Sequence, residues 1–183
     1  MSKRPKVESE KRLLNEFLTV DEEMLTYPSG YQTAYYRMSL PASHSVSIIA
    51  TTADGKWVFN REWRQAVRQE VLALPGGFIE EGENPLSSAE RELLEETGYR
   101  GKNPKILGKS YPMPGICTQQ ILFIHIEAVE KIKEPQLDPG EIINPTLFDK
   151  DALRQYIKEE RPVDGILLTG LYFFGCSQSS FSL

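Results

Sequence analysis

The chain has 183 residues, of which 40% are hydrophobic and 26% charged, and its formal net charge is −5. These values are ordinary for a globular protein large enough to form one domain with a substantial core. The negative charge disfavours non-specific nucleic-acid binding, which needs a basic surface, and no apolar run approaches the ~20 residues of a membrane helix.

The N-terminal stretch MSKRPKVESEKR is charged and lacks the apolar middle of a signal peptide. A cytoplasmic location is therefore expected. Cys117 and Cys176 fit a reducing compartment and show no spacing typical of metal ligands.

Strand patterns dominate the first half of the chain. Residues 1–12 are polar and predicted to be frayed, and Ala53-Asp54-Gly55 is predicted to be a hairpin turn. Residues 133–145 are predicted to be a proline-rich, acidic connection. The predicted strands are residues 15–24, 31–40, 44–52, 56–60, 71–74, 106–109 and 121–129.

Three helices are predicted after the glycine turn at residues 75–77. The first has Asn84 as N-cap, Pro85 in its first position and Gly98 after its last. Its inward stripe is predicted to be Leu86, Ala89, Leu93 and Thr97, and the carboxylates Glu92, Glu95 and Glu96 are predicted to lie away from it.

The second helix is expected over residues 149–160, and Asp164 is expected to cap a third that runs to about residue 174. The inward side chains of the second are predicted to be Leu153, Tyr156 and Ile157. Strands and helices alternate irregularly, which favours an α/β domain with a mixed sheet.

The first helix carries an unusual concentration of carboxylates. Glu92 and Glu96 are four residues apart, so they share a face, and Glu95 lies beside them. Like charges at this spacing destabilise an isolated helix by a few tenths of a kcal/mol per pair, roughly. Hard divalent cations bind carboxylate oxygens, so this helix is predicted to carry a metal site.

The same residues belong to a longer pattern: Gly77, five residues, Glu83, seven residues, then Arg91-Glu92-Leu93-Leu94-Glu95-Glu96-Thr97-Gly98-Tyr99. This pattern resembles the Nudix box. Every fixed position is present, and Tyr99 stands where the family usually has an aliphatic residue. The resemblance implies an α/β/α sandwich with a mixed β-sheet.

A looser resemblance to the ADP-ribose and nucleoside-diphosphate-sugar pyrophosphatase branch covers nearly the whole chain. It rests on Pro28-Ser29-Gly30, Glu62-Trp63-Arg64, Leu74-Pro75-Gly76-Gly77, Pro114, Glu141 and Asp164-Gly165. It implies N-terminal strands over residues 1–40 that serve dimerisation or substrate contact, and a Nudix domain over residues 41–183. It also implies a homodimer in which the N-terminal strands are exchanged.

The resemblance assigns roles to the residues of the box. Glu92, Glu95, Glu96 and the carbonyl of Gly76 would bind Mg²⁺ or Mn²⁺. Glu141 in the late acidic loop would activate water, with Asp138 as an alternative, and Glu95 is a further catalytic candidate. Structural roles are expected for Gly77, Glu83, Arg91 and Gly98, with Glu83 and Arg91 forming an ion pair.

Five residues are implied to contact substrate: Arg37, Arg64, Phe78, Pro114 and Gln119. Arg64 and Arg37 would face the phosphates. Glu62 and Trp63 replace the glutamine and tyrosine usual before the first arginine. Gln119 stands where the branch often has a glutamate for the terminal sugar, so a hexose remains open alongside ribose.

Together these residues imply a Mg²⁺-dependent hydrolase acting on a small-molecule nucleotide sugar, ADP-ribose or a relative. The products would be a nucleoside monophosphate and a sugar phosphate. The alternatives are a Nudix hydrolase of NADH, dinucleoside polyphosphates or damaged dNTPs, and a non-catalytic nucleotide sensor. A sensor usually lacks box carboxylates, and none is lacking here. No nucleic-acid or membrane partner is expected.

Overall fold

The computed structural model describes residues 4–178. Residues 1–3, which belong to the predicted frayed end, lie outside it. The chain forms two compact units: residues up to His44 together with Tyr111–Gln120, and Ser45–Ser110 together with the rest from Ile121. The first unit thus includes a loop from the middle of the chain.

The first unit contains an antiparallel sheet of three strands, β1 (Lys6–Asn15), β2 (Thr19–Thr26) and β3 (Gln32–Ser39). The prediction of a frayed segment was wrong for residues 6–12. This stretch has no apolar pattern, and all of β1 is exposed. Its pairing with β2 satisfies the backbone groups along one of its edges, and Arg12 forms an ion pair with the buried carboxylate of Asp21.

The second sheet has the order β6-β5-β4-β8-β7, and β9 pairs with β5. β5 runs antiparallel to β4, β6 and β9, and β7 runs antiparallel to β8. The strand bounds are β4 (His44–Thr51), β5 (Trp57–Arg64), β6 (Gln69–Ala73), β7 (Tyr99–Ser110), β8 (Gln120–Lys131) and β9 (Ile143–Phe148).

β9 was missed by the sequence analysis, which assigned its first half, residues 143–145, to a connection. Pro145 argues against a central strand, because proline cannot donate a backbone hydrogen bond. β9 pairs with β5 and lies off the main strand order, and a proline is tolerated in such an edge strand. β9 brings the end of the late acidic loop beside β5.

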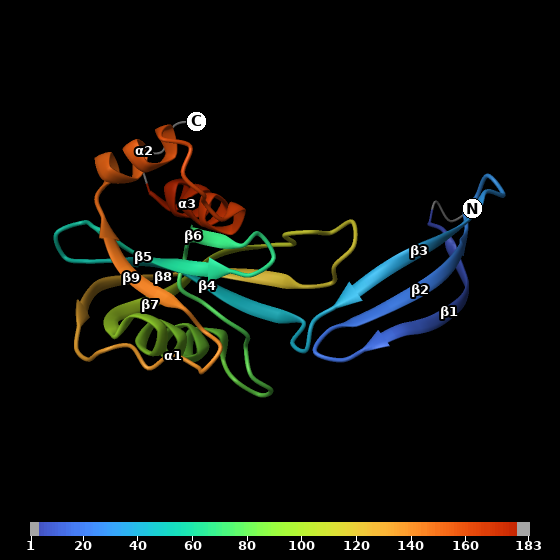
Figure 1. The fold of residues 1–183 in the computed structure, drawn as a ribbon, viewed down its shortest axis with the longest axis horizontal. Coiled ribbons are helices and arrows are strands. Elements are labelled where there is room, and N and C mark those ends of the chain that lie inside the picture. Colours follow the sequence, from blue (N-terminus) through green and yellow to red (C-terminus); the bar gives the residue numbers. More distant parts are fainter. Residues whose placement is uncertain (1–3, 179–183) are drawn as a thin grey trace. The chain divides into compact units, whose positions relative to one another are not determined.

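Three helices, α1 (Pro85–Thr97), α2 (Lys150–Lys158) and α3 (Gly165–Ser177), cover the two faces of this sheet (Figure 1). The side chains of β4 alternate between two cores. Ile48 packs in the core that contains Leu93 of α1, and Ile49 packs in the core that contains Leu167 of α3. The predicted α/β/α sandwich is confirmed.

The ends of α1 lie where the sequence predicts them. The Asn84 side chain accepts a 2.9 Å hydrogen bond from the backbone N–H of Leu86, and Pro85 opens the helix. Gly98 ends it with φ 75° and donates its N–H to the carbonyl of Leu94. A glycine suits this left-handed position because it has no Cβ.

Two predicted helix faces need correction. Glu96 does not lie away from the core, because it is only 6% exposed at the end of α1. Its burial follows from hydrogen bonds to neighbouring loop and strand, which no helical periodicity reveals. Ile157 of α2 is 42% exposed, whereas Leu153 and Tyr156 are buried.

Within residues 4–178, no helix is both long and apolar enough to span a membrane.

Candidate metal and phosphate site

The turn before α1 brings backbone against the strand β4. The carbonyls of Pro75 and Gly77 accept hydrogen bonds from Ile48 and Val46 at 2.8 and 2.9 Å. Gly76 lies between them with φ 153°, and a Cβ there would overlap the carbonyl oxygen of Val46. Only glycine fits this approach.

Glu96 faces this turn from the last turn of α1. Its Oε2 accepts two hydrogen bonds of 2.9 Å, from the N–H of Gly76 and from Nδ2 of Asn60. Burial, together with the neighbouring carboxylates of Glu92, Glu62 and Glu141, raises the pKa of Glu96 to about 8. A buried carboxylate among other carboxylates favours a bound cation.

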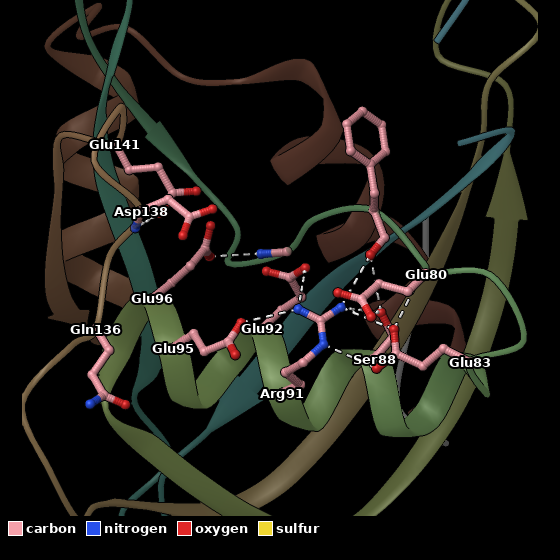
Figure 2. Close-up of polar contacts among 12 residues, drawn as sticks. Glu80, Glu83, Ser88, Arg91, Glu92, Glu95, Glu96, Gln136, Asp138 and Glu141 are labelled. Atoms are coloured by element: carbon pink, nitrogen blue, oxygen red, sulfur yellow. Dashed lines mark hydrogen bonds and ion pairs between the residues drawn. The ribbon is translucent and has the colours of Figure 1, made fainter. Parts of the chain in front are cut away.

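Arg91 is the centre of the polar contacts on α1 (Figure 2). Its guanidinium donates to both oxygens of Glu83 at 3.0 Å, so the expected ion pair is present. The same side chain reaches Glu92 Oε1 at 2.9 Å and Glu95 Oε2 at 3.0 Å. Arg91 therefore ties the acidic loop to the carboxylate face of the helix.

The three helix carboxylates share a feature. Among contacts within residues 4–178, the hydrogen bonds to Glu92, Glu95 and Glu96 fall on one oxygen of each: Oε1, Oε2 and Oε2. The other oxygen of each remains for another ligand. The half-buried Glu92 has a raised pKa, chiefly because of burial and despite Arg91.

The donor set fits a hard divalent cation, since it consists of carboxylate oxygens beside a glycine carbonyl. In the part of the chain that the structure describes, however, no three His, Cys, Asp or Glu side chains converge closely enough to form a ready metal cluster. Arg91 instead contacts both Glu92 and Glu95. The residues that would hold the ion are Gly76, Glu92, Glu95 and Glu96.

The late acidic loop is anchored to the end of α1. The N–H of Gln136 donates to the carbonyl of Glu95 at 2.7 Å. Further along, Glu141 and Asp138 form a closed turn, in which the N–H of Asp138 donates to Glu141 Oε2 at 3.0 Å. Both acids lie at the end of α1 that carries the Glu96 carboxyl group (Figure 2). The charge of Glu141 raises the pKa of Glu96.

One face of β5 extends the site. Every second side chain of a strand points to the same face, so Asn60, Glu62 and Arg64 share the face of Val58. Val58 packs against α1. Their exposure rises outward: Asn60 is fully buried, Glu62 is half-buried and Arg64 is exposed. Arg64 pairs with Glu62, whose pKa is raised mainly by burial.

Sequence reasoning did not place Asn60 or Glu62 among the site residues. Asn60 reads as part of an apolar strand, and Glu62 as a mere replacement for glutamine. The sequence does contain a signal for both. Polar residues at every second position after Val58 indicate that this face of the strand extends from the core toward solvent.

The other predicted substrate residues are distributed over both units. The half-buried Phe78 follows the glycine turn, and its carbonyl accepts from Arg91 at 3.3 Å. The exposed Pro114 and the half-buried Gln119 belong to the first unit.

Arg37 also belongs to the first unit, on β3. Its guanidinium pairs with Glu10, Asp21 and Glu23 at 2.7, 3.1 and 2.8 Å. Its contact with a substrate phosphate stays a prediction, since the structure shows it fully engaged by carboxylates.

The family model of the NUDIX domain matches residues 42–168. The chain belongs to the Nudix family. The match covers the glycine turn, α1, the late loop and the start of α3, so all the Nudix residues described above for the second unit lie within it.

Three curated relatives are about a third identical to this Nudix protein over the segments that align. The methanol dehydrogenase activator of Bacillus methanolicus is 32% identical over 66% of this chain and 65% of its own length. The ADP-ribose pyrophosphatase of Bacillus subtilis is 30% identical over 54% of each chain. The ADP-sugar pyrophosphatase of Mus musculus is 33% identical over 51% of this chain and 45% of its own.

The chain thus spans about half to two thirds of the relatives that it matches. A solved structure of an ADP compounds hydrolase superposes with a TM-score of 0.82, covering 93% of this chain and 92% of the other, at 18% identity. This likeness supports the fold.

Proposed function

We propose that the protein is a Mg²⁺-dependent hydrolase, with Mn²⁺ as a substitute, that cleaves the pyrophosphate of ADP-ribose or a related nucleoside diphosphate sugar. Its products are a nucleoside monophosphate and a sugar phosphate. The observation that carries this proposal is the buried Glu96 carboxylate, which accepts a hydrogen bond from the N–H of Gly76 and has Glu92 and Glu141 near enough to raise its pKa. Arg64 lies at the exposed end of the β5 face to which Asn60 and Glu62 belong.

The relatives support the substrate class. Two of them are named for ADP-ribose or ADP-sugar pyrophosphatase activity. The complete set of box carboxylates favours catalysis over nucleotide sensing.

The reaction needs a nucleophile, a proton acceptor and neutralisation of the phosphates. Mg²⁺, when bound, supplies positive charge that screens the phosphate oxygens and makes water more acidic. The oxygen of water attacks one phosphorus atom, the bond from that phosphorus to the bridging oxygen breaks, and the bridging oxygen leaves with the other phosphate.

Side chains of the protein accept the proton, contact the phosphates and position the acidic loop. Glu141 accepts the proton of the attacking water, and the hydrogen bond from Gln136 to the carbonyl of Glu95 keeps its loop beside α1. Arg64 contacts the phosphates once it exchanges Glu62 for substrate. Glu83 and Arg91 hold the acidic loop against α1 so that Gly76 keeps its position.

A turnover screen tests the proposal. ADP-ribose, ADP-glucose, UDP-sugars and GDP-mannose are incubated with the protein and Mg²⁺, and the products are separated by chromatography. We expect AMP from the ADP-sugars. Faster release of products from NADH, diadenosine polyphosphates or oxidised dNTPs would assign the protein to another substrate class.

We also propose that the protein is a homodimer that uses its N-terminal sheet. β1 is a ten-residue edge strand whose side chains are all exposed, including Val7, Leu13 and Leu14. Long exposed edge strands invite pairing with another chain. Light scattering after size exclusion should give twice the 20.8 kDa chain mass, and a monomer would contradict the proposal.

A further inference from the structure

Asn60 is an amide in a strand position that otherwise belongs to the core. It is 0% exposed, and its neighbour on the same face of β5, Val58, packs among apolar side chains of α1 and β8. Burying an amide costs free energy unless both of its polar ends find partners. A residue retained for packing alone would be apolar here.

Only half of this amide is satisfied within the described chain. Its Nδ2 donates to Glu96 Oε2 at 2.9 Å, and its Oδ1 has no hydrogen-bond partner among residues 4–178. An unpaired buried oxygen destabilises a fold. The bond to Glu96 is therefore the contact that distinguishes asparagine from an apolar residue at this position.

The N–H of Gly76 donates to the same Oε2 atom, also at 2.9 Å. Two donors from different segments, one from β5 and one from the glycine turn, fix the rotation of the Glu96 carboxylate. They leave its Oε1 without a hydrogen bond from either and hold it in one orientation.

We propose that Asn60 is a positioning residue for the metal site: it orients Glu96 so that Oε1 faces the divalent cation. This inference rests on the proposed function, because it assumes that Glu96 binds the cation. Groups that orient a metal ligand commonly contribute 10- to 100-fold to metal affinity, roughly.

Direct Mn²⁺ binding tests the role without relying on turnover. Free Mn²⁺ is measured by electron paramagnetic resonance during titration of the wild type, Asn60→Leu, Glu96→Gln and the double variant. Leucine has the same number of side-chain heavy atoms as asparagine and removes the donor. We expect Asn60→Leu to weaken Mn²⁺ binding at least threefold, and we expect this effect to vanish in the Glu96→Gln background.

Val58→Ala is the matched control, because it loosens the same face of β5 without touching Glu96. It should weaken Mn²⁺ binding less than threefold. A loss equal to that of Asn60→Leu would show that Asn60 acts only through strand stability and would overturn the inference. If Asn60→Leu does not fold, Asn60→Ala is held to the same threshold.

The two proposals fail in different ways. If Glu96→Gln binds Mn²⁺ as the wild type does, the metal site itself is misassigned. If Glu96→Gln weakens binding and Asn60→Leu changes it less than threefold, only the positioning role of Asn60 is refuted.

Discussion

The guanidinium of Arg91 and the carboxylate of Glu83 form a two-pronged ion pair, with Nε to Oε1 and Nη2 to Oε2 both at 3.0 Å. The hydrogen bonds from Arg91 lower the pKa of Glu83 from its ordinary 4.5 to about 2. The pair joins the acidic loop to α1, on which Glu92 and Glu95 also contact Arg91. Its stability contribution should therefore depend on pH.

Glu83→Gln tests this dependence. Because the folded-state pKa lies below the ordinary value, the charged form of Glu83 stabilises the fold above about pH 4.5. That contribution is lost as the pH falls toward 2. We expect the variant to lose about 1–2 kcal/mol of unfolding free energy at pH 7 and to converge on the wild type in acid.

Urea denaturation at several pH values measures the difference. Glu80→Gln, an exposed change in the same loop, is the control and should leave the unfolding free energy unchanged. A Glu83→Gln deficit that stays constant down to pH 3 would exclude the ion pair as its source.

Gly76→Ala should be severely destabilising. The added Cβ would overlap the carbonyl oxygen of Val46, and the φ of 153° is strained for any other residue. We expect a loss of about 2–4 kcal/mol in unfolding free energy and weaker Mn²⁺ binding. In the control Gly165→Ala, the added Cβ would meet open space. This variant should have a urea midpoint of unfolding near that of the wild type.

Glu141→Gln separates the two acids of the late loop. If Glu141 is the proton acceptor, its removal should lower kcat by about 10²–10⁴-fold. Asp138→Asn removes the neighbouring acid while keeping the backbone turn, so its kcat should fall less than tenfold. The reverse order of effects would transfer the role to Asp138.

Arg64→Ala tests the phosphate contact. We expect KM for ADP-ribose to rise about tenfold or more, because a charged hydrogen bond contributes about 1.5–3 kcal/mol. Arg61 lies on the opposite face of β5, near the rings of Phe148 and Tyr156. Arg61→Ala should leave KM within about twofold of the wild type, and equal KM values for both variants would refute the contact.

Local sequence signals predicted much of this molecule. The caps of α1 at Asn84 and Gly98 are chemically specific, and the spacing of the box placed Glu92, Glu95 and Glu96 on that helix. The class of fold followed from the box and was confirmed by the structure.

Long-range contacts were not predictable in the same way. The sequence gives no sign that Glu96 is buried, since this depends on Asn60 and Gly76 from other segments. β1 and β9 were also not predicted, because they form strands by pairing with β2 and β5 and have no apolar periodicity of their own.

The most direct test of the central claim is cleavage of ADP-ribose by the wild type and Glu96→Gln, with Mg²⁺ and with EDTA, followed by quantifying AMP and ribose phosphate. We predict stoichiometric release of both products by the wild type with Mg²⁺. Release should be lost with EDTA and reduced at least 100-fold in Glu96→Gln. Undiminished release by Glu96→Gln with Mg²⁺ would contradict the account.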